Sequence, residues 1–327
     1  MADRERALVT GATGVIGPAL VASLVQAGYH IRVLARSAVP PGLFPATVEI
    51  APGTINDRAA VAAALADVNV VFHLAAQLHI NDPAPALRAR YTEVNVEGTR
   101  TLVDAANAAQ VRRFIHFSTI NVYGPSRPGQ LLDERSPLQP DSWYAETKAQ
   151  AEEIALAAGN AAILRLSAVY GPGMKGNYLR LLRAIERGRF VMIGDGRTRR
   201  TLVHLHDVAT AALLAGAHPA AQGRVYNVTD GAVHTLGEIV AAQALAVGRR
   251  PPRLHLPVGP IRLAVGLIED TGRLVGRRPP IGRATLQKLL EDVAVDGTRI
   301  ATELGFQPAY DLLTGWQRTV QELEQAR

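Results

Sequence analysis

Tyr144 and Lys148 are the residues whose types and spacing point most directly to chemistry. Side chains four residues apart on a helix share one face, so the Lys148 ammonium can lie beside the Tyr144 phenol. A free tyrosine has a pKa near 10, and we expect the ammonium, together with an oxidised nicotinamide ring, to lower it. Thr119 can hydrogen-bond the reacting oxygen. These side chains predict proton transfer to or from a hydroxyl as a hydride moves.

The turn from Thr10 to Gly17 spaces three glycines as Gly-x-x-Gly-x-x-Gly after the first apolar stretch. Gly11 permits a tight turn, Gly14 lets a pyrophosphate approach the backbone, and Gly17 lets a helix pack closely on a strand. A helix that starts there presents unpaired N–H groups and its positive dipole end to an anion. The turn predicts a dinucleotide site formed by Gly11, Thr13, Gly14, Val15, Ile16 and Gly17.

The end of the second predicted strand, Leu34-Ala35-Arg36-Ser37, contains no carboxylate. A site for NAD usually has Asp or Glu there, which accepts hydrogen bonds from the ribose hydroxyls. Arg36 can instead pair with a 2′-phosphate, assisted by the Ser37 hydroxyl. A solvated surface arginine is the alternative. We expect NADP to be favoured over NAD.

Apolar stretches of strand length alternate with Ala-rich stretches of helix length through the N-terminal half. Strands are expected at 7–9, 30–34, 48–50, 68–74, 113–117 and 161–166, and helices at 14–27, 58–66, 94–109 and 143–158. This alternation implies right-handed crossovers and a parallel sheet covered on both faces. The predicted fold class is α/β, with a doubly wound, Rossmann-type sheet.

The alternation lapses from about Gly171, which predicts a smaller α+β substrate domain. The expected division is 1–172 for the dinucleotide-binding domain and 173–327 for the substrate domain, with 200–216 packing back on the first. Further elements are expected in the second part: helices at 177–187 and 207–215, strands at 189–193 and 202–205, and a capping box at Thr235 that opens another helix.

Residues 261–275 are apolar and compatible with a helix. They could form a helix of the substrate domain or contact a membrane surface. The pentapeptide Gly-Arg-Arg-Pro-Pro occurs on both sides of this stretch, at 248–252 and 276–280, and predicts two exposed loops stiffened by proline.

The composition excludes several classes of protein. With 327 residues, of which 48% are hydrophobic and 20% charged, the chain can bury a large core. The sequence contains no cysteine, which excludes disulfides, thiolate metal sites and a cysteine nucleophile. The longest apolar runs fall short of the roughly 18 residues that a spanning helix needs. The charged start, residues 1–6, predicts no secretory signal, so a cytoplasmic location is expected.

The formal charge of +6 raises the question of nucleic acid. The basic residues are not clustered with aromatic residues, which make up 5% of the chain, so we expect no nucleic-acid partner. The histidines at 73, 116, 204 and 206 are interpreted as structural, and no metal site is expected.

Eight segments together resemble the extended short-chain dehydrogenases/reductases, the group that includes the nucleotide-sugar epimerases, dehydratases and 4-keto reductases. They are 10–17, 71–76, 95–99, 118–124, 144–148, 164–173, 200–207 and 303–308. The segments follow the family's order and span nearly the whole chain, so the resemblance implies the family's fold, its nicotinamide cofactor and its type of site.

Carried over to this chain, the resemblance places Thr119, Tyr144 and Lys148 on the catalytic positions. It implies cofactor contacts by residues near several strand ends: Ile55, Leu74, Ala75, Ala76, Asn95 and Ser118, besides Tyr144 and Lys148. It also implies substrate contacts by Gln77, Thr119, Asn121, Lys175, Asn177 and Arg200. Of these, Arg200 matches an arginine that contacts the diphosphate in sugar-nucleotide enzymes.

The chain departs from the family pattern at three places. Thr54 stands where an Asp usually contacts the adenine, and 166–168 replace the usual Pro and Asn of this strand end. Near residue 286 the second diphosphate arginine of UDP-galactose 4-epimerases is absent, and Arg283 or Lys288 could substitute for it. These departures weaken the assignment of a nucleotide sugar but leave the dehydrogenase chemistry intact.

The expected function is oxidation or reduction at C4 of a nucleotide-activated sugar, by a 4-epimerase or a 4-keto reductase. Arg36 favours the reductase, which consumes NADPH, whereas the likeness of 171–207 to sugar epimerases favours the epimerase. The alternatives are an NADP-dependent dehydrogenase of hydroxysteroid or dihydroflavonol type and a non-catalytic dinucleotide-binding sensor. A nucleotide sugar is the expected partner, and a homodimer the expected assembly.

Overall fold

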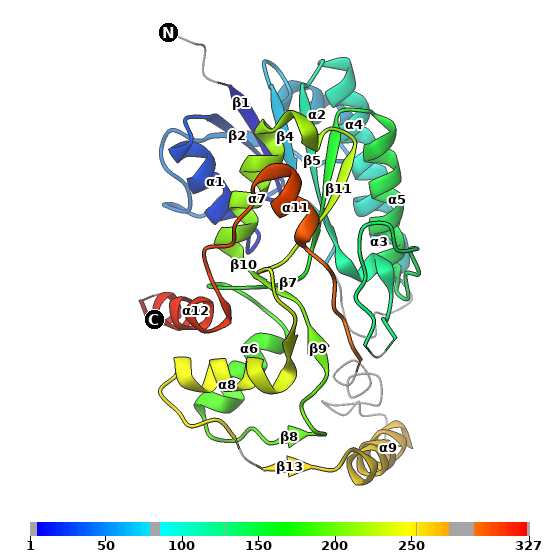
Figure 1. Cartoon of the computed structure of the whole chain (residues 1–327). Coiled ribbons are helices and arrows are strands. Elements are labelled where there is room, and N and C mark those ends of the chain that lie inside the picture. The colour runs from blue at the N-terminus through cyan, green and yellow to red at the C-terminus, as the bar shows by residue number, and fades with distance from the viewer. Residues whose placement is uncertain (1–4, 79–85, 128, 253, 275–290, 326–327) are drawn as a thin grey trace.

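The computed structural model describes residues 5–78, 86–127, 129–252, 254–274 and 291–325. Its centre is a seven-stranded sheet with strand order β11-β6-β5-β4-β1-β2-β3, in which every neighbouring pair is parallel (Figure 1). The strands are β1 (Arg6–Thr10), β2 (His30–Ala35), β3 (Glu49–Pro52), β4 (Val70–His73), β5 (Arg113–Thr119), β6 (Ala161–Leu166) and β11 (Arg224–Val228). The strand order reverses between β1 and β4, which is where open parallel sheets bind ligands.

Helices cover both faces of the sheet, which explains why its strands are almost continuously apolar. Ala7 and Val9 of β1 pack in one core cluster, while Leu8 between them packs in the other. The first cluster includes α1 (Gly17–Gln26), α7 (Leu205–Ala217) and α11 (Thr298–Leu304). The second includes α2 (Arg58–Ala64), α4 (Gly98–Ala108) and α5 (Trp143–Ala157). The predicted doubly wound Rossmann-type fold is confirmed.

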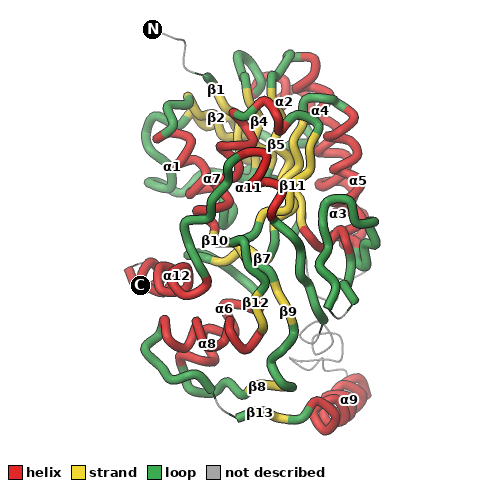
Figure 2. Tube along the Cα trace, viewed as in Figure 1, coloured by secondary structure: helices red, strands yellow, loops and turns green. Residues whose placement is uncertain are grey.

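Among the described residues, short pieces of sheet and several helices form the part below the main sheet (Figure 2). Three strand pairs occur here: β7 (Ala168–Tyr170) with β10 (Leu202–His204), β9 (Arg199–Arg200) with β12 (His234–Thr235), and β8 (Met192–Ile193) with β13 (His255–Leu256). The helices are α6 (Asn177–Glu186), α8 (Leu236–Ala246), α9 (Val258–Leu274) and α12 (Leu312–Gln325). Tyr170 stacks on Trp316 at 4.5 Å between ring centroids and ties α12 to β7.

Most predicted elements occur close to their expected places, and the differences are informative. The capping box at Thr235 is formed, but the strand expected at 189–193 is limited to Met192–Ile193. Helix 94–109 begins instead as a π-helical turn, Thr92–Glu97, which follows α3 (Leu87–Tyr91). The first Arg-Arg-Pro-Pro segment is a loop, as predicted, whereas 276–280, Arg283 and Lys288 lie outside the described residues.

The division at residue 172 stays a prediction. The structure packs α7 against α1, β5 and β6, and it adds β11 to the main sheet beside β6. Residues that follow the expected boundary thus contribute to the larger sheet, since its seventh strand comes from the second half of the chain.

Candidate active site

The turn after β1 passes so close to its surroundings that only glycine fits at two positions. Gly11 has a φ of +71°, and a Cβ on it would lie 2.5 Å from the Ala75 nitrogen. A Cβ on Gly17 would lie 1.9 Å from the Ala12 carbonyl oxygen. α1 begins at Gly17, and its N-cap residue, Ile16, makes no side-chain capping hydrogen bond among the described residues. Pro18 has no N–H and the Gly17 N–H donates to the Gly14 carbonyl at 3.2 Å, so the positive end of the helix dipole, rather than these two residues, favours an anion here.

The other predicted cofactor residues follow the carboxyl edge of the same sheet. Arg36 and Ser37 come directly after β2 and are exposed, as are Thr13 and Gly14 in the glycine turn. The segment Leu74, Ala75 and Ala76 follows β4, and Ser118 is near the end of β5. This edge spans the switch point, so it can hold an extended dinucleotide.

Two of the three predicted catalytic side chains, Thr119 and Tyr144, are hydrogen-bonded to each other where α5 packs on β5. The Thr119 hydroxyl accepts a hydrogen bond from the Asn121 backbone at 3.2 Å and forms another with the Tyr144 hydroxyl. One turn further along α5, Lys148 is 2% exposed, and its Nζ lies 2.9 Å from His116 Nε2. The sheet end thus holds a tyrosine–threonine pair, with a buried amine behind it.

The electrostatics of this group differ from the sequence-based expectation. Burial raises the pKa of Tyr144 to about 12, helped by the Tyr91 phenol and opposed by the hydrogen bond with Thr119. Burial also lowers the pKa of Lys148 to about 7, against the opposing effect of Glu152. The expected lowering included an oxidised nicotinamide ring and so stays a prediction for the cofactor-bound enzyme. In the protein alone the pKa of Tyr144 is raised, because desolvation dominates. Tyr144 keeps its proton at neutral pH and can donate it to an oxygen.

His116 is a site residue that the sequence analysis treated as merely structural. It shares a face of β5 with Ser118, two residues on, and this face meets α5 at Lys148 and Glu152, four residues apart. When Lys148 is charged it can only donate, and His116 then accepts at Nε2 and carries its proton on Nδ1, which has no hydrogen-bond partner among the described residues. Burial, then Lys148, lowers the pKa of His116 well below its usual value, which keeps the ring neutral. The sequence signal that could have revealed this role is that two residues one strand repeat apart, His116 and Ser118, face two residues one helical turn apart, Lys148 and Glu152.

A buried ion pair fixes the end of β5. Ser118, predicted to contact the cofactor, donates its hydroxyl proton to the Glu152 carboxylate, which pairs with Arg165 of β6 at 2.6 Å. Arg165 Nη1 donates to the Tyr123 hydroxyl at 2.9 Å, and that hydroxyl donates to Asn227 Oδ1 of β11 at 2.8 Å. Three strands and α5 are therefore joined by one chain of polar contacts.

A second buried chain fixes the loop after β4. Thr99 donates to the Asn95 carbonyl at 2.7 Å, so His73 Nε2 donates to Thr99 at 2.9 Å and His73 Nδ1 accepts from Thr10 at 2.7 Å. Burial, with a contribution from the Lys148 charge, lowers the pKa of His73 to about 3, so this ring is neutral. The Asn95 side chain accepts from the Gln77 backbone at 2.7 Å and so holds the loop in place.

A cavity of about 230 Å³ opens beside Thr119. Its lining includes three predicted substrate residues: Thr119, Asn121 and Arg200. Tyr178, which sequence analysis missed, lines it too, together with Ile120, Leu166, Ser167, Ala168, Thr201 and Val293. Three other predicted substrate contacts, Gln77, Lys175 and Asn177, do not line this cavity. Lys175 and Asn177 are exposed where α6 begins.

Arg200 and Tyr178 form a pair in the cavity wall. The guanidinium donates to the Tyr178 oxygen and, through Nη1, to the Arg199 carbonyl at 3.0 Å. Burial lowers the pKa of Arg200, while Tyr178 and two acidic residues raise it; burial raises the pKa of Tyr178. The wall therefore presents a positive group beside a neutral phenol, which suits an anionic ligand.

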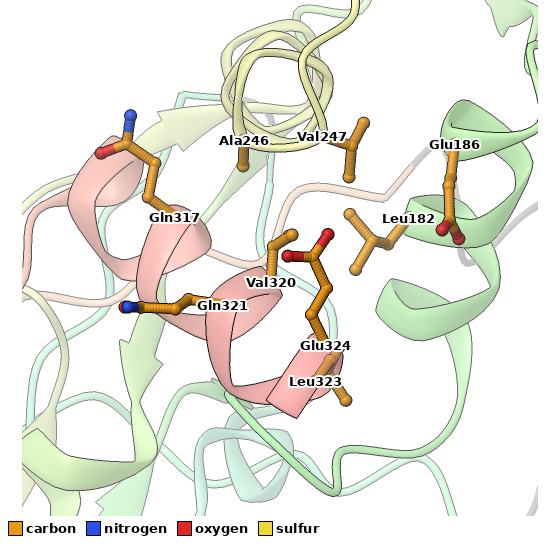
Figure 3. A pocket seen from close by; sticks show the side chains of 9 residues that line it. All are labelled: Leu182, Glu186, Ala246, Val247, Gln317, Val320, Gln321, Leu323 and Glu324. Carbon is orange, nitrogen blue, oxygen red and sulfur yellow. The ribbon is translucent and has the colours of Figure 1, made fainter. Parts of the chain in front are cut away.

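A second cavity, of about 250 Å³, lies between α6, α8 and α12, away from these residues (Figure 3). Its lining comprises apolar side chains, two glutamines, Glu186 and Glu324, and none of the predicted site residues. Across the described part of the chain, we find neither a cluster of three potential metal ligands among His, Asp and Glu nor a helix long and apolar enough to cross a membrane.

Comparison with known proteins also supports the interpretation of the sheet edge as a dinucleotide site. The model of the NAD dependent epimerase/dehydratase family matches residues 7–229. The chain is 28% identical over 325 residues to N-acetyl-alpha-D-glucosaminyl-diphospho-ditrans,octacis-undecaprenol 4-epimerase of Escherichia coli O157:H7, covering 97% of this chain and 95% of that relative. It is 30% identical over 331 residues to UDP-glucose 4-epimerase of Vibrio cholerae, covering 98% and 95%.

A solved structure extends the likeness to three dimensions. MoeE5 in complex with UDP-glucose and NAD is similar with a TM-score of 0.76 and 26% identity, covering 98% of this chain and 99% of that one. Because the family model spans more than half of the chain, and the Vibrio relative is similar over nearly its full length, the chain belongs to the NAD dependent epimerase/dehydratase family and is an NAD(P)-dependent enzyme of the extended short-chain dehydrogenase/reductase type.

Proposed function

We propose that this enzyme oxidises and reduces C4 of a sugar carried by a diphosphate, acting as a 4-epimerase. The observation that carries the proposal is that the wall of one cavity contains both Thr119, the partner of Tyr144, and the half-buried arginine Arg200. A proton-transfer pair and an anion-binding group thus border the same space. The two 4-epimerases among the relatives support the choice of reaction.

In this proposal Tyr144 exchanges a proton with the C4 oxygen. Its high pKa makes it a proton donor when a keto group is reduced, while Thr119 orients the phenol through its hydrogen bond. Oxidation of the hydroxyl requires the reverse transfer, in which the ionised phenol of Tyr144 accepts the proton of the C4 hydroxyl. A positive charge close to the phenol stabilises this ionised form. The nicotinamide cofactor, which the glycine turn and the sheet edge are suited to hold, supplies and accepts the hydride.

The diphosphate is proposed to bind against Arg200. A guanidinium already held by Tyr178 and by a backbone carbonyl is pre-positioned, so little of its conformational freedom is lost on binding. Ser167 and Thr201 add buried hydroxyls that have no hydrogen-bond partner among the described residues. A polar ligand in the cavity can satisfy these hydroxyls, which makes the wall better suited to a sugar diphosphate than to an apolar alcohol.

The cofactor is proposed to be NADP in preference to NAD, because Arg36 stands where an NAD site has a carboxylate. A charge-assisted hydrogen bond to the 2′-phosphate contributes about 1.5–3 kcal/mol, and the exposure of Arg36 favours the lower end. Arg36→Asp should invert the preference, measured as dissociation constants for NADP and NAD, while Arg58→Asp on exposed α2 should leave it unchanged. Tighter NAD binding by the wild type would contradict the NADP assignment.

The substrate class is tested by incubating the enzyme and either cofactor with UDP-glucose, UDP-N-acetylglucosamine and UDP-glucuronic acid, and resolving the C4 epimers by proton NMR. We expect conversion of at least one of them, and loss of conversion in Tyr144→Phe. A 4-keto reductase would instead consume NADPH once per turnover with a 4-keto sugar. If a hydroxysteroid were oxidised while every sugar stayed unchanged, the apolar-alcohol alternative would replace the proposal.

A lipid diphosphate is a second candidate for the group that carries the sugar. It is favoured by the relative of Escherichia coli, whose name describes an undecaprenol-linked sugar, and by the exposed leucines of α9. The same NMR assay with a polyprenyl-diphosphate sugar in detergent distinguishes the two carriers, since conversion of the lipid-linked sugar alone would exclude the nucleotide.

The proposal also includes a cytoplasmic location and a homodimer. Both follow from the sequence-based expectations. Sedimentation equilibrium of the purified chain tests the homodimer, because a dimer has twice the monomer mass of 34.9 kDa. A monomer at all concentrations would remove this part of the proposal.

A further inference from the structure

The end of the substrate domain that carries α9 exposes an unusual set of apolar side chains. Leu263 and Leu267 are 72% and 67% exposed, more than any other large hydrophobic side chain in the described part of the chain. Ile268 on the same helix is 55% exposed, and Leu254, just before β13, is 61% exposed. Leu263 and Leu267 are four residues apart and share one face of α9, whereas Ile268 lies on the neighbouring face and Leu254 precedes β13. The two leucines therefore form a short apolar stripe, with the other two side chains beside it. Such a gathering marks an interaction surface.

Arginines flank this stripe. Arg249 and Arg250 are exposed in the loop from α8 to β13, and Arg262 is exposed on α9. The sequence between Ile239 and Ile268 contains four arginines and no Asp, Glu or Lys, and Glu269 and Asp270 follow it on α9, with Asp270 exposed. Over the longer stretch 239–290 it contains nine of the 35 basic residues and two of the 29 acidic ones, which gives +7 for the stretch and −1 for the rest of the chain. The positive charge of the chain is therefore not evenly distributed.

The apolar and basic segments lie at one end of the molecule. Figure 1 shows α9, β13 and the loop from α8 to β13 along the lower end, on the side away from the seven-stranded sheet. β13 pairs with β8 and connects the loop directly to α9, which starts at Val258. One external surface can thus meet the leucines and the arginines together.

We propose that this end of the substrate domain rests on the surface of an anionic phospholipid bilayer. The docking face is formed by Arg249, Arg250, Leu254, Arg262, Leu263, Leu267 and Ile268. The leucines enter the boundary between headgroups and acyl chains, and the arginines pair with lipid phosphates. The inference does not depend on the identity of the substrate, because it rests on the surface alone.

The charge also argues against two other occupants. A second copy of the chain, related by a twofold axis, would bring the same arginines against one another. A single-stranded nucleic acid would be expected to stack on aromatic side chains, and residues 239–290 contain no Phe, Trp or Tyr. An anionic lipid surface suits both the apolar stripe and the positive charge.

The test is co-sedimentation of the full chain with vesicles, either of phosphatidylcholine alone or with about one third phosphatidylglycerol. We expect binding to the anionic vesicles at least tenfold stronger than to the neutral ones, with marked weakening between about 0.1 M and about 0.5 M salt. The double variant Leu263→Ser/Leu267→Ser should bind at least tenfold more weakly. The double variant Arg249→Gln/Arg250→Gln should lose about fivefold for each arginine.

Two matched variants control for general effects: Leu313→Ser on α12, where the leucine is 38% exposed, and Arg58→Gln on α2. Both should bind like the wild type. All four variants change exposed side chains, so their melting temperatures and cofactor affinities should match the wild type. No binding by the wild type, equal binding to neutral vesicles, or unchanged binding by the leucine variant would overturn the proposal. So would a concentration-dependent dimer that the leucine variant abolishes, because it would identify a second copy as the occupant.

Discussion

The catalytic half of the site and its substrate half are built in different ways. Thr119 and Lys148 sit on β5 and α5, where buried parallel strands and two chains of polar contacts leave little room for movement. Arg200 and Tyr178 come instead from a two-residue strand and the first turn of α6, in the part of the fold made of short strand pairs.

This difference suggests a division of labour. The sheet edge fixes the atoms that transfer a proton, because displacing them would break buried contacts with Glu152, Arg165 or His73. The substrate half has fewer such constraints, so it can change its ligand without disturbing the chemistry. Variants in the two halves should therefore fail in different ways: through turnover or stability in the first half, and through binding in the second.

The largest effect is expected from Tyr144→Phe, which removes the transferred proton and should lower turnover by about 10²–10⁴-fold. Cofactor affinity should not change, because the ring is kept. The matched variant in the other half, Tyr178→Phe, loses the hydroxyl that Arg200 contacts, so its KM should rise while its turnover number is kept. Steady-state kinetics measures both variants. If both changed the same parameter, turnover number or KM, the difference proposed between the two halves of the site would be wrong.

Glu152→Gln should cost about 3–5 kcal/mol of unfolding free energy, because it leaves the Arg165 charge buried without its partner. Its neighbour Glu153 is exposed, so Glu153→Gln serves as the control and should cost almost nothing. Chemical denaturation measures both. Equal losses would mean that the buried pair does not stabilise the end of β5.

In the substrate half, Arg200→Ala should weaken nucleotide-sugar binding by about 2 kcal/mol or more, if the arginine makes a buried charged hydrogen bond to the diphosphate. Its stability should change less than that of Glu152→Gln. Arg197→Ala, at an exposed position in the same segment, should bind as the wild type does. Calorimetry that finds equal affinities for the three proteins would remove Arg200 from the binding site.

Stability is also expected to depend on pH through Lys148. Its pKa falls from 10.5 to about 7 on folding, so between these values the unfolded chain binds more protons and stability rises with pH. The cost of burying the charge is complete below about pH 7 and disappears towards about pH 10.5. Relative to the wild type, Lys148→Met should therefore gain more in melting temperature at about pH 6 than at about pH 10. If the melting temperatures of the variant and the wild type differed by the same amount at both pH values, the lowered pKa of Lys148 would be contradicted.

The same two halves differ in how far the sequence predicts them. The glycine turn and the Tyr144–Lys148 spacing are local patterns, so their placement at the sheet edge could be expected from the sequence alone. The role of His116 depends on which helix covers its strand, and the pairing of Tyr178 with Arg200 joins residues that are distant along the chain. A two-residue strand such as β9 forms because it pairs with another strand, here β12, and not because its own residues favour a strand. The raised pKa of Tyr144 follows from burial, which spacing does not reveal.

The central claim is that hydride and proton transfer at C4 depend on Tyr144. It is tested most directly with a nucleotide sugar that carries deuterium at C4, converted by the wild type and by Tyr144→Phe and analysed by NMR. The account predicts that the 4-epimer keeps its deuterium at C4, because the hydride is removed and returned without exchange with water, and that the variant forms no epimer. Loss of the deuterium to solvent, or an epimer formed at the normal rate by Tyr144→Phe, would contradict it.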